Sequence, residues 1–380
     1  MKMEKGLVAV PDIQLKNNWE ETIQRFDAWF QHKNTGRPLM NLYAYRDPAS
    51  PPYPKYTEEP FDDARDMFLN ADKNFARLMN FYGWVEPLAE AFPQFSMNLG
   101  AGSLALYLGS EPLFAPDTLW FTHFIEEYDD CLPLRYDPDN VWWRKHLEII
   151  RRQLELTRNT DIMVCIPDLI ENIDILSAMR DPQTCCFDLY DYPDEVHEAL
   201  QNISDVYMTY YDAIYDLVKK PDGVCAYTAF NILGTGKTAK IQCDFSALLS
   251  PEHFDEYILP SLKRQCEEIP NTMFHLDGPE CLCHVDSLMS IEKLGCLQWT
   301  PGARNPKAGS EAWYELYTKV RNADKGLWIG LSDYEPEEAI AAADQLVKKF
   351  GPAGMYFHFP YMPRDMADAL LIKAERDWKI

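Results

Sequence analysis

Short apolar runs alternate with longer amphipathic stretches through the second half of the chain. The apolar runs, each of which predicts a strand, are 161–166, 223–228, 240–244, 272–276, 296–300, 326–331 and 354–359. The stretches between them have helical spacing and predict helices at 171–180, 194–219, from Ser250, at 280–294, 310–322 and 335–350, and from Pro363. Regular alternation of strand and helix demands parallel strands with right-handed crossovers, as in a doubly wound sheet or a closed barrel.

The first 160 residues are less regular. The pattern predicts a strand at 37–45 and helices at 61–83 and 139–157, with a proline-rich loop at 48–60 that could roof a barrel mouth. No internal repeat is present. We therefore predict an N-terminal helical extension over residues 1–36, followed by a single α/β domain over residues 37–380.

Nucleotide-binding fingerprints are missing from the predicted turns. Residues 234–240, GTGKTAK, lack the spacing of a P-loop, and no GxGxxG follows a predicted strand. This favours a (β/α)8 TIM barrel, in which chemistry gathers at the carboxyl ends of the strands. The residues at those predicted ends are Asp168, Tyr227, Asp244, His275, Asp277, Trp299, Ser332, Asp333 and His358. We expect His275, Asp168, Asp244, Trp299 and His358 to share one rim of a closed barrel.

The densest chemical segment is FHLDGPECLCH, residues 274–284. His275 and Asp277 are two residues apart in a predicted strand, so both side chains point the same way. They form an acid/base pair or half of a zinc site; alternatively, the pair orders a loop. His358 could supply a third ligand or be a satisfied core histidine. Cys281, Cys283 and His284 lie in a predicted helix, where adjacent side chains diverge, so at most one or two could reach a common ion.

Other candidates surround these residues. Asp168 follows Pro167 at a strand end and is predicted to contact a ligand in a catalytic role, whereas Glu171 and Asp174 also suit a helix start. Trp299 would form an aromatic wall or pack in the core. The candidate substrate-binding residues are Asn98, Tyr227, Asp244, Trp299, Glu171, Asn172 and Arg46.

Composition and charge narrow the classes of function. The chain has 36 basic and 60 acidic residues and a net charge of −24, which excludes a simple nucleic-acid binder. No run of about 18 apolar residues and no leader with an apolar core is present, so we expect a cytoplasmic protein without a membrane span. The 10 cysteines are expected to be free thiols.

Four segments in order, 92–114, 167–196, 243–263 and 274–302, resemble the uroporphyrinogen decarboxylase superfamily, most closely its corrinoid-dependent methyltransferase branch. The resemblance spans roughly residues 37–375 and implies a (β/α)8 barrel. True uroporphyrinogen decarboxylases carry an arginine-rich segment after the first strand. The matching stretch here has Arg46 as its one arginine, which disfavours a polyanionic tetrapyrrole substrate.

Zinc-dependent methyltransferases of this branch bind the metal through a His-x-Cys pair and a later Cys. Here His275 matches the His, Asp277 replaces the Cys, and His358 is nearest to the later position. The resemblance implies methyl transfer between a small O- or N-methyl donor and a corrinoid (cobalamin) on a partner protein, with zinc at His275, Asp277 and His358. A lyase that decarboxylates a small aromatic or tetrapyrrole-like carboxylate and a non-catalytic ligand-binding barrel are the alternatives, and a homodimer stays open.

Overall fold

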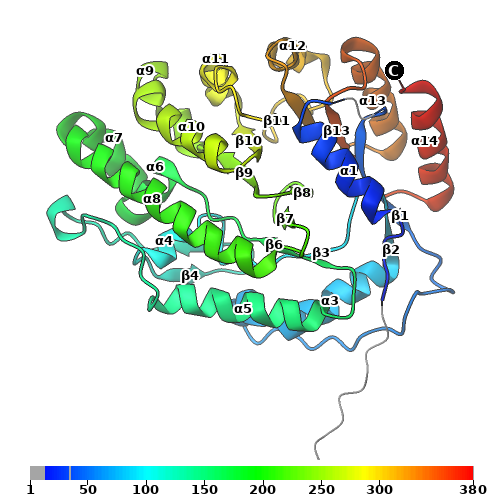
Figure 1. The fold of residues 1–380 in the computed structure, drawn as a ribbon, viewed down its shortest axis with the longest axis horizontal. Helices are drawn as coiled ribbons and strands as arrows, with labels where there is room; N and C mark the ends of the chain where they lie inside the picture. Colours follow the sequence, from blue (N-terminus) through cyan, green and yellow to red (C-terminus); the bar gives the residue numbers. More distant parts are fainter. Residues whose placement is uncertain (1–12, 34–35, 380) are drawn as a thin grey trace, which may run out of the picture.

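A seven-stranded sheet forms the larger β-layer of the computed structural model, which describes residues 13–33 and 36–379 (Figure 1). Its ladders are parallel except for that between the first two strands. The strand order is β2 (Val85–Ala89), β1 (Leu39–Tyr45), β13 (Met355–His358), β12 (Gly326–Gly330), β11 (Cys296–Thr300), β10 (Asn271–Asp277) and β9 (Thr238–Gln242).

A second sheet has four strands. Its order is β3 (Gln94–Phe95), β6 (Met163–Ile166), β7 (Val224–Tyr227) and β8 (Ile232–Thr235). The first two ladders are parallel, and β8 folds back antiparallel on β7. A separate hairpin pairs β4 (Pro112–Phe114) with β5 (Leu119–Phe121).

The predicted closed barrel is not confirmed, because no ladder joins these two sheets within the described residues. A ring of parallel strands would need β1 to pair with β3 and β7 to pair with β9. Instead, β2 occupies the free edge of β1 and β8 occupies the free edge of β7. The two antiparallel returns therefore interrupt the ring at two places, and the chain is an α/β fold with an open arrangement of strands.

Helices flank the strands on the outside (Figure 1). The helices are α1 (Trp19–Phe30), α2 (Ala64–Leu69), α3 (Ala71–Trp84), α4 (Leu104–Tyr107), α5 (Val141–Thr157), α6 (Asn172–Arg180), α7 (Pro182–Asp191), α8 (Pro193–Val218), α9 (Pro251–His253), α10 (Leu259–Glu268), α11 (Val285–Met289), α12 (Tyr314–Asn322), α13 (Pro336–Phe350) and α14 (Arg364–Asp377). Shorter turns are η1 (Tyr128–Asp130), η2 (Asp244–Leu248), η3 (Phe254–Ile258), η4 (Pro279–His284) and η5 (Glu311–Trp313). None of the helices in the described part of the chain has the length and apolar character that a membrane crossing requires.

Some predicted helices are divided in the structure. The helix predicted over 61–83 is two helices, because Asn70 ends α2 and its side chain accepts a hydrogen bond from the Lys73 N–H at 3.1 Å, which caps α3. The helix start at Ser250 is confirmed, since its hydroxyl accepts from the His253 N–H at 3.2 Å. The helix α7 was not predicted.

The helix α1 covers the amino ends of the strands. The Trp29 indole N–H donates to the Gly354 carbonyl at 2.9 Å, just before β13, and the Asp27 carboxylate accepts from the Thr235 N–H at 2.7 Å at the end of β8. Trp29 and Phe26 also stack edge-on against Tyr356. This helix lies within the extension predicted over residues 1–36, of which 1–12, 34 and 35 fall outside the described residues.

A buried carboxylate ties this helix to the sheet. Glu90 is fully buried and forms ion pairs with Arg25 of α1 at 2.6 Å and with Arg37 before β1 at 2.9 Å. It also accepts the Met40 N–H at 2.7 Å. Both arginines pair with this buried carboxylate. Removing its negative charge would therefore break two ion pairs at once.

We expect Glu90→Gln to destabilise the fold by about 3–5 kcal/mol, the usual cost of breaking a buried ion pair on one side. Glu375→Gln is the matched control: Glu375 also pairs with Arg37 at 2.9 Å, but its side chain is 49% exposed, so the expected loss is below about 1 kcal/mol. Urea unfolding measures both. Equal shifts of the two unfolding midpoints would contradict this assignment.

Candidate functional site

Three neighbouring strands present a row of polar side chains near their carboxyl ends. Gln242 of β9 is the register partner of His275 in β10, which in turn is the partner of Gln298 in β11. Register partners in parallel strands point to the same side of the sheet, and alternation adds Lys240, two residues before Gln242. The strands therefore build one polar surface from residues far apart in the sequence.

Asp168, which follows β6, is tied to this surface. The Tyr227 hydroxyl at the end of β7 donates to one carboxylate oxygen of Asp168 at 2.9 Å, and the Lys240 ammonium donates to the other at 2.8 Å. All three side chains are buried. Lys240 also donates to the Gln242 amide oxygen, so two acceptors contact this buried positive charge.

Asp244, His275 and Asp277 form the group in the described residues that could hold a metal ion, with one ligand atom from each within 4.8 Å of the others. The Gln242 amide N–H donates to the Asp244 carboxylate at 2.9 Å and so links this group to Lys240. The two aspartates are exposed and His275 is half-buried. The group thus opens to solvent at the strand ends.

The hydrogen bonds of Gln298 fix the tautomer of His275. The Gln298 amide nitrogen donates to the Thr300 hydroxyl at 2.9 Å, which leaves its amide oxygen to accept from His275 Nδ1. The lone pair is then on Nε2, the form of histidine that binds a metal. Desolvation and the nearby Lys240 charge lower the pKa of His275, which further favours the neutral ring.

Negative charge exceeds positive charge in this region. Lys240 pairs with Asp168, whereas no ion pair with Lys, Arg or His compensates Asp174, Asp244 or Asp277 in the described structure. Desolvation and then the charge of Asp244 raise the pKa of Asp174 to about 6, and desolvation also raises the pKa of Asp277. A bound cation would relieve this repulsion.

His358 does not join the metal-binding group, and Asp244 takes the place predicted for it. His358 ends β13, which is separated from β10 by β12 and β11. Its ring packs against Trp328 at a centroid distance of 5.5 Å, and burial lowers the pKa of His358 to about 4. Phe230 lies between the two histidines, 5.0 Å from His275 and 5.1 Å from Trp328. The rings of Phe230 and Trp328 thus separate His358 from the metal-binding group.

Trp299 and Arg46 have structural contacts. Trp299 alternates with Gln298 along β11 and therefore faces the other way, where its ring packs on Trp313 at 4.9 Å. The Arg46 guanidinium donates to the Tyr82 and Val85 carbonyls at 3.1 and 2.9 Å, so it joins β1 to the end of α3. In the described structure, neither side chain has a hydrogen bond, ion pair or ring contact with Asp244, His275 or Asp277.

Asn172 and Asn98 are also predicted to bind substrate. The Asn172 side chain donates to the Gln242 carbonyl at 2.8 Å and accepts from the Asp174 N–H at 3.1 Å, so it holds the start of α6 against the end of β9. Asn98 follows β3, and its side-chain oxygen is buried without a hydrogen-bond partner in the described structure. Asn172 therefore fixes the loop after β6 beside the metal-binding group. The Asn98 side chain has no hydrogen bond to that group in the described structure.

The cysteine segment after β10 follows the helical expectation. Cys281 is buried and accepts from the Ser246 hydroxyl at 3.3 Å, whereas Cys283 is exposed. His284 stacks on Phe254 at 4.4 Å and hydrogen-bonds the Ser246 carbonyl. Cys283 Sγ lies 3.4 Å from His284 Nε2, so two of these side chains meet, and the three form no metal-binding group of three ligands within the described residues.

Sequence reasoning missed Lys240, Gln242 and Gln298. The segment KIQCD carried a usable signal, because alternation places Lys240, Gln242 and Asp244 on one face of a strand. A lysine inside an otherwise apolar strand needs a buried partner. That partner, Asp168, follows a different strand.

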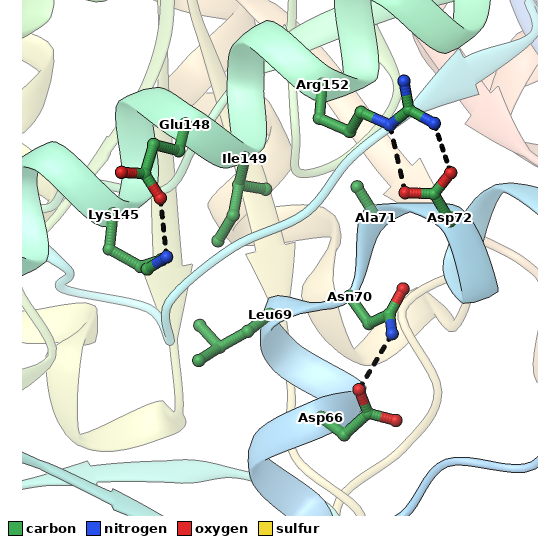
Figure 2. Close-up of a pocket in the computed structure, with 9 residues that line it drawn as sticks. All are labelled: Asp66, Leu69, Asn70, Ala71, Asp72, Lys145, Glu148, Ile149 and Arg152. Carbon is green, nitrogen blue, oxygen red and sulfur yellow. Dashed lines mark hydrogen bonds and ion pairs between the residues drawn. The ribbon is translucent and has the colours of Figure 1, made fainter.

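A cavity of about 300 Å³ lies elsewhere, between the junction of α2 with α3 and the outer face of α5 (Figure 2). Its charged groups already pair with each other: Arg152 with Asp72 at 3.0 Å, and Lys145 with Glu148 at 2.6 Å (Figure 2). It contains none of the predicted site residues. The strand ends therefore remain the candidate site.

Comparison with known proteins supports the fold. The chain resembles the solved structure of a methyltransferase from Methanosarcina mazei, with a TM-score of 0.59 over 93% of this chain and 98% of that one, at 11% sequence identity. No protein-family profile and no curated protein sequence matches the chain. The chain thus shares the fold of that structure.

Glu171, just after Asp168 in the chain, has a buried carboxyl group that should make the stability of the protein depend on pH. Its carboxylate is buried beside the Ser204 side chain, and burial raises the pKa of Glu171 to about 8. The unfolded chain releases this proton near pH ~4.3, so the folded state binds more protons between that pH and 8, and stability falls as pH rises through this window.

Glu171→Gln should remove this pH dependence. We expect the variant to gain stability relative to the wild type by up to about 1.4 kcal/mol per pH unit across the window, with no gain below pH ~4. Denaturant unfolding at pH 4.5, 6 and 8 measures the difference. A difference that is constant over this range would contradict the buried, protonated carboxyl.

Proposed function

We propose that this protein is a methyltransferase that moves a methyl group between a small O- or N-methyl donor and a corrinoid carried by a partner protein. One observation carries the proposal: Asp244, His275 and Asp277 converge at the strand ends of a methyltransferase-like fold. The resemblance to the corrinoid-dependent branch of the uroporphyrinogen decarboxylase superfamily supports the same reaction.

The donor set fits a divalent ion such as zinc. Two carboxylates and an imidazole with its lone pair on Nε2 are ordinary zinc ligands, and three protein ligands leave a position for substrate. An ion bound there would act as a Lewis acid toward the oxygen or nitrogen that loses its methyl group. A carboxylate is a harder metal ligand than a thiolate. A zinc ion held by Asp277 in place of a thiolate would therefore bind an oxygen or nitrogen donor in preference to a thiol.

Hydrogen bonds from neighbouring side chains fix the positions of Asp244 and His275. Lys240 and Gln242 hold Asp244, and Gln298 orients His275, so the functional side chains are supported by fixed neighbours. Asp277 lies on the same face of β10 as His275, so one strand supplies two of the three ligands. The uncompensated carboxylates oppose an anionic substrate, which disfavours the decarboxylase alternative.

His275→Ala tests the central residue. We expect the variant to form methylcobalamin from cob(I)alamin about 10²–10⁴-fold more slowly than wild type, the range for a lost acid, base or ligand-binding group. The assay follows the visible spectrum of cobalamin with a panel of methoxy and N-methyl compounds. His197→Ala, on the exposed face of α8, is the control and should keep the wild-type rate. A His275→Ala protein with the wild-type rate would falsify the assignment.

Zinc affinity gives a separate test that needs no donor. Calorimetric titration of the chelator-treated protein should show one zinc per chain, and Asp244→Asn should weaken binding at least 10-fold because a ligand is lost. Asp333→Asn changes an exposed aspartate that follows β12 and should bind like wild type. Identical zinc affinities for the wild type and Asp244→Asn would show that Asp244 is not a zinc ligand.

A further inference from the structure

A cavity of about 340 Å³ adjoins the candidate site on the side of α6. Its apolar lining includes Phe121, Ile175, Phe245 and Leu248. Asp174 and Asp244 also line it. The volume is in the range of small-molecule pockets, and Asp244 belongs both to this cavity and to the metal-binding group.

The carboxylate of Asp174 is held in place from one side. One of its oxygens accepts the Asp244 N–H at 2.9 Å and the other accepts the Phe245 N–H at 2.8 Å. The Gln242 amide also donates to the first oxygen at 3.5 Å, so the second oxygen keeps a lone pair for a ligand. The two backbone bonds fix the direction of this negative charge without neutralising it.

No lysine, arginine or histidine lines the cavity in the described structure. The nearest cation in the cluster, Lys240, is committed to Asp168 and Gln242. A ligand that enters the cavity therefore meets two carboxylates and several hydrocarbon side chains. An anionic ligand would find no partner there.

Gly102 keeps the cavity open. Its backbone has a φ of +88°, and a Cβ at this position would meet Ile175 Cδ1 at 3.4 Å and Phe121 Cε2 at 3.6 Å. A side chain there would project between two residues of the apolar lining. Its absence leaves the space between Phe121 and Ile175 free for a ligand.

We propose that this cavity binds the substrate as an organic cation, with its ammonium group at Asp174 and its carbon body against Phe121, Ile175 and Leu248. The proposal rests on the proposed function and names its substrate class: a small organic cation whose methylated oxygen or nitrogen lies toward Asp244 and His275, apart from the ammonium group at Asp174. Carboxylates neutralise the charge, and an aromatic ring such as Phe121 attracts an alkylated ammonium group.

Choline and 3,3-dimethylbutan-1-ol test the proposal, because they have the same shape and differ in charge. Calorimetry or ligand-observed NMR with the full chain should show choline binding at least 10-fold more tightly than the neutral alcohol. Asp174→Asn should reduce choline binding at least 5-fold and leave the alcohol unchanged, so that the preference for charge shrinks.

Ala178→Leu provides a second variant that alters no charged or hydrogen-bonding group. Ala178 lines the cavity, so a leucine there should reduce the binding of both probes. Equal binding of the two probes to the wild type, or choline binding that neither variant changes, would overturn the proposal.

The outcome is separable from that of the proposed function. Methyl transfer to cobalamin from neutral methoxy compounds, without a preference for methoxy compounds that carry an ammonium group, would support the function and overturn the cavity assignment. Choline binding that depends on Asp174, without methyl transfer from any compound tested, would support the cavity assignment and contradict the function.

Discussion

The buried ion pair between Asp168 and Lys240 connects two sheets that no strand ladder joins. Asp168 follows β6 in the smaller sheet and Lys240 lies in β9 at the edge of the larger one. Burying both charges is costly, and the hydrogen bonds from Tyr227 and to Gln242 offset that cost by satisfying the remaining polar atoms. This pair thus links the carboxyl ends of the two sheets at the site.

Other cross-sheet bonds reinforce this junction. Asn172 donates to the Gln242 carbonyl, and Asp174 accepts the N–H of Asp244, so the loop after β6 is bound to the end of β9. On the far side, the Tyr356 hydroxyl and the Trp328 indole donate to the carbonyls of Asn231 and Phe230 in the β7–β8 turn. Side chains thus perform the closure that ladders perform in a barrel, and they bring the functional groups of both sheets to one place.

Local pattern was sufficient for much of the fold and part of the site. The apolar runs located β1, β6, β7 and β9–β13 within about two residues, because buried parallel strands are continuous apolar segments. Alternation also placed His275 and Asp277 on one face. The short returns β2 and β8, which open the ring, have no such signature, since their pairing depends on the edges left free by their neighbours.

The remaining differences depend on contacts between distant residues. The importance of Lys240 follows from Asp168, 72 positions earlier, and the orientation of Trp299 follows from the register of β11 with β10. His358 was expected at the metal site from its position at a strand end, but the strand order places β11 and β12 between it and His275. Sequence gives the chemical groups at the strand ends, whereas strand order decides which of them meet.

The central claim is that the strand ends gather Asp244, His275 and Asp277 into one cation-binding site. Anomalous diffraction at the zinc edge from crystals soaked in zinc tests it most directly. The account predicts one strong peak enclosed by these three side chains, with His275 Nε2 facing it and Gln298 on Nδ1. A soaked crystal with no peak between these residues, or with its strongest peak at Cys283 and His284, would contradict it.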